Sequence, residues 1–190
     1  MKQIKLASAI ALAMGIAVVG SAQAASGGTI TFTGSVTDAT CTVSGGAGSD
    51  GGTGNFSVAL DEVNANQLAA AGDTANKKAF SVIIGGPGQG TCTDGKVASM
   101  SFLPSSIHVD AATGALKNAL TGEATNTQVQ LLDGGAAGTP INLAAGTYAA
   151  TATIANNTAT IPFSVQYLAV NGAATPGLVS TNVVYAVTYN

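Results

Sequence analysis

The sequence predicts an all-β protein, folded as an antiparallel sandwich in one domain. Short runs of five to nine residues are alternating or apolar, and clusters of Gly, Asn, Asp and Pro separate them. Such runs at this spacing are typical of a sandwich. The 166 residues that follow a predicted leader fit one domain with a real core, since no shift in composition and no long proline-rich linker divides them.

The first element is the leader. Two lysines precede an apolar run that ends near Gly20, and Ala22-Gln23-Ala24 has the small residues of a cleavage site. This pattern predicts a secretory signal peptide over residues 1–24. The alternative is a membrane anchor, which needs about 20 apolar residues, and this run is shorter. We therefore expect residues 25–190 to be exported and soluble.

The second element, residues 25–38, is an alternating segment. Ile30, Phe32, Gly34 and Val36 occupy one face, and threonine or serine occupies the other. The segment precedes the first cysteine and has no tight hairpin turn of its own. We expect a half-buried strand that needs a sheet to pair with.

Residues 39–190 are expected to form the sandwich itself. One stretch, residues 64–72, predicts a helical turn capped by Gly72. Charged residues make up only 8% of the chain, a composition that favours packing of chain against chain over a freely soluble surface. The predicted strands before the C-terminus cover residues 56–60, 79–85, 97–103, 127–133, 139–143, 146–154 and 160–170.

The last element, residues 181–190, is an apolar strand. Val183, Tyr185, Val187 and Tyr189 alternate with the residues between them, and β-branched and aromatic side chains favour a strand. An unpaired strand edge readily pairs with another chain. The pattern leaves two possibilities open, because the neighbour of this strand belongs either to the same molecule or to another one.

The two cysteines, Cys41 and Cys92, predict a disulfide, which an oxidising compartment permits. It would close a loop of about 50 residues and contribute on the order of 4 kcal/mol in the chain-entropy model. The alternative is a metal site. With His108 as the one histidine of the chain, a Cys/His zinc site lacks ligands.

The remaining composition argues against an enzyme and against nucleic-acid binding. Without the leader, four lysines and no arginine stand against nine acidic residues, a formal charge of −5, so phosphate neutralisation is not expected. His108 is the single possible histidine base, and a lone histidine near Asp110 is more often a surface residue than part of a catalytic triad. The adjacent acids Asp61 and Glu62 would point to opposite faces of a strand. The glycine-rich run "GGPGQGTC" lacks the ending of a phosphate loop. We expect no cofactor and no small-molecule substrate.

Several segments together resemble pilins of the chaperone–usher class, close to the type 1 and P pilus shaft subunits of Gram-negative bacteria. They are the arm "ITFTGSVTDATC", the stretch "FSVIIGGPGQGTC", the middle strand "ATNTQVQLLD", the run "TIPFSVQYLAVNGAATPG" and the terminal strand. The family has a glycine fourteenth from the end, here Gly177, and a penultimate tyrosine, here Tyr189. The matching parts span nearly all of residues 25–190.

The resemblance implies an incomplete immunoglobulin-like antiparallel sandwich that lacks its last strand and is completed by a donor strand from another chain. The implied donor residues are Ile30, Phe32, Gly34 and Val36, with Gly34 meeting a shallow site. The implied acceptor edge consists of Gly177, Val183, Tyr185, Val187 and Tyr189.

The resemblance also implies the partners and the location. A periplasmic pilus chaperone lends a strand first. At an outer-membrane usher, the arm of a neighbouring copy or a related pilin replaces it. This is strand addition, and its head-to-tail geometry builds an open filament. The mature protein would then lie in an adhesive pilus on the cell surface, after export through the periplasm.

Two alternatives concern the type of subunit and the class of protein. Tip adhesins of this class carry a receptor-binding domain before the pilin domain, and here the arm directly follows the leader, so the resemblance implies a shaft or minor structural subunit. The length and the Ala, Gly and Thr content favour the major shaft subunit. The alternative class is a self-contained secreted β-sandwich that binds a ligand and pairs both terminal strands internally.

Overall fold

The structure is a computed structural model that describes residues 40–134 and 138–190. The predicted leader and arm, including Ile30, Phe32, Gly34 and Val36, lie outside the described residues. In the described part of the chain, no helix has the length and apolar character that crossing a membrane requires.

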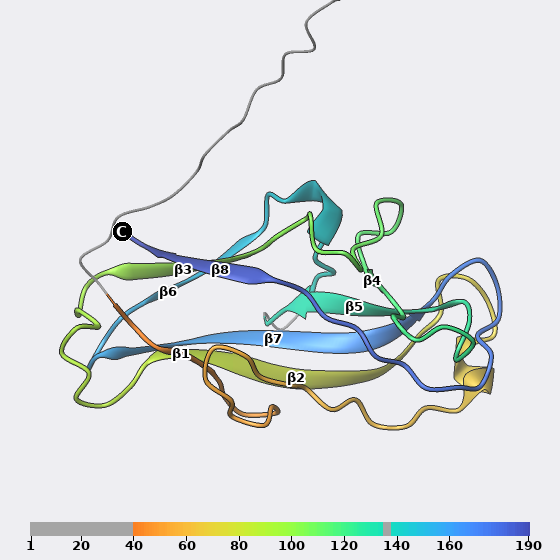
Figure 1. The fold of residues 1–190 in the computed structure, drawn as a ribbon, viewed down its shortest axis with the longest axis horizontal. Helices are drawn as coiled ribbons and strands as arrows, with labels where there is room; N and C mark the ends of the chain where they lie inside the picture. Colours follow the sequence, from red (N-terminus) through yellow and green to blue (C-terminus); the bar gives the residue numbers. More distant parts are fainter. Residues whose placement is uncertain (1–39, 135–137) are drawn as a thin grey trace, which may run out of the picture. The chain divides into compact units, whose positions relative to one another are not determined.

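The larger of two antiparallel sheets has five strands (Figure 1). Its centre is formed by the two longest strands, which pair over most of their length. In spatial order, the strands are β1 (Val43–Gly45), β2 (Thr74–Gly85), β7 (Thr158–Ala169), β5 (Thr127–Asp133) and β4 (Leu116–Lys117).

The smaller sheet has three strands, in the order β6 (Ala149–Thr153), β3 (Val97–Phe102) and β8 (Tyr185–Tyr189). Figure 1 shows β8 beside β3, with the C-terminus at its end. Two short 3₁₀ turns, η1 (Ala65–Leu68) and η2 (Leu143–Ala145), complete the described elements. The all-β, antiparallel prediction is therefore confirmed.

The core lies between the two sheets. Phe163 of β7 is 1% exposed, and its ring packs edge-on against Phe102 of β3 with 5.5 Å between ring centres. Ile84 of β2 and Met100 of β3 are also fully buried. Residues from both sheets thus share one apolar cluster, as expected for a sandwich.

A disulfide joins Cys41, just before β1, to Cys92, in the loop between β2 and β3. The disulfide prediction is confirmed, and the metal alternative is wrong for these two residues. Thr40 N–H donates to the carbonyl of Thr91 at 3.1 Å. The start of the described chain is thereby held against the β2–β3 loop.

The predicted elements agree best in the middle of the chain. The strand over 127–133 matches β5, and those over 97–103, 146–154 and 160–170 match β3, β6 and β7 within three residues at each end. Residues 139–143 form one isolated bridge, from Pro140 to Leu132, so the strand predicted there is wrong. Gly72 does not cap the turn either, because η1 ends at Leu68 with Ala69 as its cap.

Candidate functional site

Among the described strands, the C-terminal strand β8 pairs along one edge only. Val97 and Asn190 exchange two backbone hydrogen bonds, and Leu103 N–H donates to the carbonyl of Val184. Because hydrogen-bonded pairs alternate along an antiparallel ladder, the even-numbered residues of this strand bond to β3. The backbone groups of the odd-numbered residues, from Val183 to Tyr189, therefore point away from β3.

The same alternation continues upstream of β8. Leu178 N–H donates to Glu123 Oε2 at 2.8 Å, and Ser180 N–H donates to Asn118 Oδ1 at 3.0 Å. Within the described residues, no hydrogen bond involves the backbone of Val179, Thr181 or Val183. One edge of this extended segment thus lacks a strand partner from residue 179 onward.

A second extended segment, residues 56–60, faces this edge across a groove. Ser57 exchanges hydrogen bonds with Asp50, through the Asp50 N–H and the Asp50 side chain, both at 3.0 Å. Val58 and Leu60 alternate with Ser57, so their backbone groups point to the opposite side, and no described residue bonds to them. The strand predicted over 56–60 is thus extended but belongs to neither sheet, because none of the described strands pairs with it.

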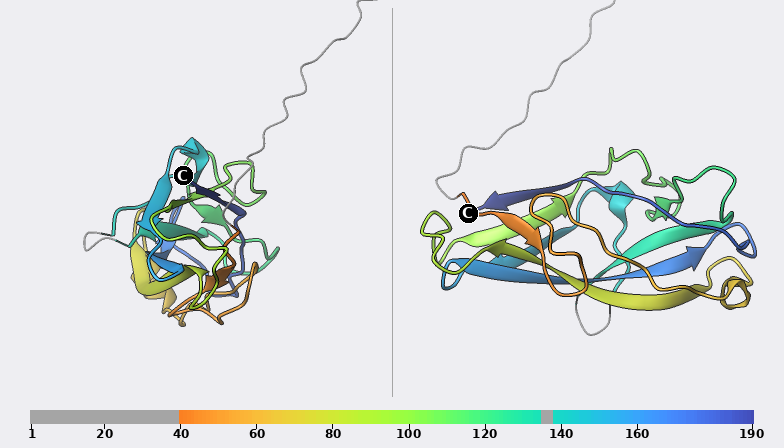
Figure 2. Two further views of the ribbon diagram at one scale, coloured as in Figure 1. Left: turned by 90° about the vertical axis from the view of Figure 1, so that its left-hand side faces the viewer. Right: turned by 60° about the horizontal axis from the view of Figure 1, so that its bottom comes forward.

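The groove between these two segments has a volume of about 660 Å³ and opens onto the core. Its walls are residues 55–60 on one side and residues 179–183 with Tyr185 on the other. Figure 2 shows the segments that follow β1 and precede β8. The floor includes Phe80, Met100, Phe102, Val129, Val165 and Tyr167, from both sheets. Apolar core side chains, all of them buried except the half-buried Phe80, thus border the groove along a line where a further strand would fit.

Two tyrosines of β8 form hydrogen bonds with the chain between residues 41 and 54. The Tyr185 hydroxyl donates to the carbonyl of Gly54, and the Tyr189 hydroxyl donates to the carbonyl of Cys41 at 3.5 Å. The rings of Tyr185 and Phe56 lie 6.0 Å apart. Burial raises the pKa of both tyrosines above the ordinary value, so both hydroxyls are protonated and can donate at neutral pH.

One polar atom in the groove wall has no hydrogen-bond partner among the described residues. Thr181 Oγ1 is buried, and it forms no hydrogen bond with any described residue. An unsatisfied buried hydroxyl costs about 1–3 kcal/mol. A chain lying in the groove would bring backbone groups to the same wall, and these could satisfy it.

The structure brings together four of the five residues predicted for the acceptor edge. Val183, Tyr185, Val187 and Tyr189 are half-buried and pack against the core. Gly177 is separate and does not line the groove. It lies at φ 155°, where a Cβ would come within 2.2 Å of Ala124 N. Its local role is this close approach of two backbone segments.

Several groove residues were not identified from the sequence. Val179 and Thr181 continue the alternation of β8 upstream, and that signal could have identified them. Val58 and Leu60 lie in a segment predicted only as an ordinary strand. Its lack of a partner is a property of the fold and has no local signal.

The polar residues considered for catalysis are dispersed. Asp61 forms an ion pair with Lys78, and Asp110 accepts hydrogen bonds from Ala112 N–H and Gln128. The Ala112 bond is the main reason that the pKa of Asp110 lies below its ordinary value. In residues 40–134 and 138–190, no three His, Cys, Asp or Glu side chains are grouped to hold a metal ion.

Comparisons with known proteins agree on one family. The family model described as "Fimbrial protein" matches residues 30–190. The chain is 39% identical to the major fimbrial subunit SMF-1 of Stenotrophomonas maltophilia, over 87% of this chain and 94% of that protein. It is 34% identical to the type-1 fimbrial protein A chain of Escherichia coli, over 86% and 83%. The fold resembles the crystal structure of an antigen and type I fimbria protein of Burkholderia pseudomallei, with TM-score 0.52, 28% identity, and coverage of 85% and 97%.

Proposed function

The chain belongs to the fimbrial protein family, and on that premise we propose that its groove receives the N-terminal arm of a neighbouring subunit. Proteins of this family are structural subunits of surface pili and not enzymes. Their fold is an immunoglobulin-like sandwich. Repeated arm-into-groove contacts would be head to tail, and such heterologous contacts build an open filament.

The observation that carries the proposal is that two backbone edges, one on each side of an apolar groove, pair with no described strand. A strand inserted there could bond to Val183 on one side and to Val58 on the other. Insertion would also add apolar contacts to the core side chains at the floor. Strand addition to an open sheet edge uses backbone bonds for affinity and side-chain sites for specificity.

The arm has a suitable length and pattern. The apolar face from Ile30 to Val36 spans seven residues, as does the groove wall from Val179 to Tyr185, and each would be about 20 Å long at ~3.3 Å per residue. Full burial of Ile30, Phe32 and Val36 would contribute about 5–9 kcal/mol in total. Gly34 presents no side chain and would lie where the groove is shallow.

We assign the chain's parts accordingly. Residues 1–24 would direct export, residues 25–38 would be the donor arm, and residues 39–190 would be the acceptor domain. Before assembly, a periplasmic chaperone would fill the groove with a strand of its own. An outer-membrane usher would then be the place where a neighbouring arm replaces that strand. The mature subunit would support cell adhesion as part of the pilus shaft.

A self-contained, ligand-binding sandwich is less well supported. It would pair both terminal strands within one molecule, whereas the outer edge of β8 pairs with no strand in the described part of the chain. A small ligand would also leave the backbone edges on both sides of the groove unsatisfied, and a strand would not.

The proposal is tested by export of residues 25–190 and of residues 39–190 in the same host. The longer chain should form a ladder of polymers that resists dissociation in mild detergent. The shorter chain should form no ladder, and an added peptide of residues 25–38 should bind it at one copy per chain. A longer chain that is a stable monomer would contradict the proposal.

A further inference from the structure

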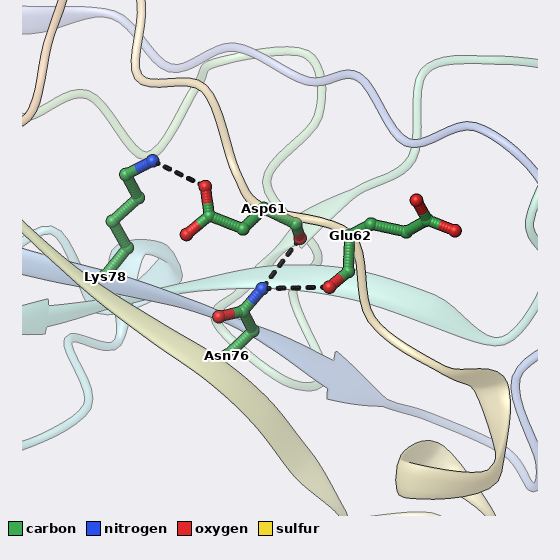
Figure 3. Close-up of polar contacts among 4 residues, drawn as sticks. All are labelled: Asp61, Glu62, Asn76 and Lys78. Atoms are coloured by element: carbon green, nitrogen blue, oxygen red, sulfur yellow. Dashed lines mark hydrogen bonds and ion pairs between the residues drawn. The ribbon is translucent and has the colours of Figure 1, made fainter.

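The wall formed by residues 56–60 pairs with no described strand. Phe56, Val58 and Leu60 pack against the core, and hydrogen bonds hold the backbone at the two ends of the wall. Asp50 holds the upstream end through Ser57. Asn76 holds the downstream end, because its side-chain amide donates to the carbonyls of Asp61 at 2.7 Å and Glu62 at 3.3 Å (Figure 3). One amide group thus anchors two consecutive peptide units directly after the wall.

A β-bulge in β2 gives Asn76 this position. Ala75 pairs with Tyr167 and Lys78 pairs with Val165, so β2 has one residue more than β7 between these pairs. Asn76 has a φ of 59°, a left-handed conformation that asparagine tolerates better than most residues. Bulges change the direction of a side chain relative to the regular strand. Asn76 is not one of the residues of β2 that pair with β7, and its side-chain amide bonds instead to the segment that follows the wall.

An ion pair lies beside this anchor. Lys78 Nζ is 2.9 Å from Asp61 Oδ1, and the two side chains are 28% and 67% exposed (Figure 3). A pair this exposed contributes little to stability. The hydrogen bonds of the Asn76 side-chain amide are therefore the stronger polar contacts at this end, where Leu60 also packs against the core.

We infer that Asn76 is a positioning residue for strand insertion, because it holds the unpaired wall at the place that an incoming strand requires. The inference rests on the proposed function of the groove. A wall that is already in place need not be ordered when the arm enters, and preorganisation of this kind reduces the cost of binding. Loss of the anchor should therefore slow insertion more than it destabilises the two sheets.

The test compares Asn76→Gly with Asn157→Gly in the full mature chain, residues 25–190. Glycine accepts the positive φ at both positions, 59° and 61°. Asn157 is a matched control because its amide also donates to a backbone carbonyl, that of Cys92 at 2.9 Å. It lies in the turn between β6 and β7, outside the groove lining. Each oxidised chain is refolded at low concentration with an excess of fluorescent peptide of residues 25–38, and the rate of peptide uptake is measured.

Asn76→Gly should take up the peptide about three- to tenfold more slowly than the wild type, the size expected for one or two lost hydrogen bonds. Asn157→Gly should match the wild-type rate. Equal rates for wild type and Asn76→Gly would overturn the inference and leave the proposed function intact. If the wild-type chain takes up no peptide at all, the proposed function itself is wrong.

Asn76→Asp provides a second readout that a general loss of stability would not produce. At neutral pH its carboxylate would face two carbonyl oxygens and should slow uptake at least as much as glycine does. Below pH ~4 the protonated carboxyl can donate a hydrogen bond, so its rate should approach that of the wild type. Asp61, Glu62, Lys77 and Lys78 are the charged groups nearby, and all variants retain them. The ratio of the Asn76→Asp uptake rate to the wild-type rate at the same pH therefore reports on position 76 alone. A ratio that does not change with pH would overturn the inference.

Discussion

Replacement of Val183 by aspartate should block strand insertion while the same change at Val184 should not. Val183 is half-buried, lines the groove and packs against the core, whereas Val184 is 52% exposed on the other face. With the groove open, the Val183→Asp carboxylate can reach water through the mouth. With the groove filled, it would be covered, and an unpaired buried charge costs several kcal/mol or forces protonation.

The magnitude follows from the carboxyl pKa in the two states. Covering the carboxylate should raise its pKa by about 2–3 units, and each unit corresponds to about 1.4 kcal/mol. The affinity for the arm peptide at pH 7 should therefore fall on the order of 100- to 1,000-fold. Because the raised pKa belongs to the filled state, binding should recover as the pH falls through that pKa.

The assay is titration of each chain with a fluorescent peptide of residues 25–38, together with the polymer ladder. Val184→Asp should bind within about threefold of the wild type, since exposed surface changes rarely exceed ~0.5 kcal/mol. Equal affinities for the Val183→Asp and Val184→Asp chains would refute the assignment of the groove wall.

Three further predictions concern the arm, the disulfide and the tyrosines. Gly34→Leu should leave the domain's melting temperature unchanged but stop or greatly slow polymerisation, because overpacking a filled site costs about 1–3 kcal/mol; an unchanged ladder would contradict the assigned register. Cys41→Ser should lower the free energy of unfolding by on the order of 4 kcal/mol, as measured by denaturant titration, and should reduce periplasmic yield; wild-type stability would contradict it. Burial raises the pKa of Tyr185 and Tyr189 in the folded state, so the tyrosines of the unfolded chain ionise first as the pH rises. The stability that these residues contribute below pH ~10 should therefore be lost as the pH rises through their folded-state pKa values. A melting temperature that does not change between pH 9 and 12 would contradict this prediction.

The strands that were predicted well are those whose pattern and partners are both local. The run over 127–133 is bounded by turn residues, and the structure forms β5 over the same residues. β1 was missed because Val43–Gly45 is only three residues long and contains glycine. Its pairing depends on β2, which is distant in sequence, and on the Cys41–Cys92 disulfide beside it.

The candidate site was predictable on one side only. The alternation of Val183, Tyr185, Val187 and Tyr189 identifies a half-buried strand, and the same period of two determines which backbone groups face the open edge. The facing wall could not be predicted, because an unpaired extended segment has the same local pattern as a paired strand. The anchor at Asn76 depends on a one-residue bulge, and the letters "TANKKAF" contain no signal of where that bulge falls.

The central claim is that an arm from another chain pairs with the open edge of the C-terminal segment. Residue-resolved amide hydrogen exchange of the polymer, compared with the chain of residues 39–190, tests it most directly. The amide of Val184 donates to Ser106 Oγ within the domain and should be protected in both samples. The amide of Val183, which has no described partner, should be protected only in the polymer. Fast exchange at Val183 in both samples, or protection of Val183 in the chain without the arm, would contradict the account.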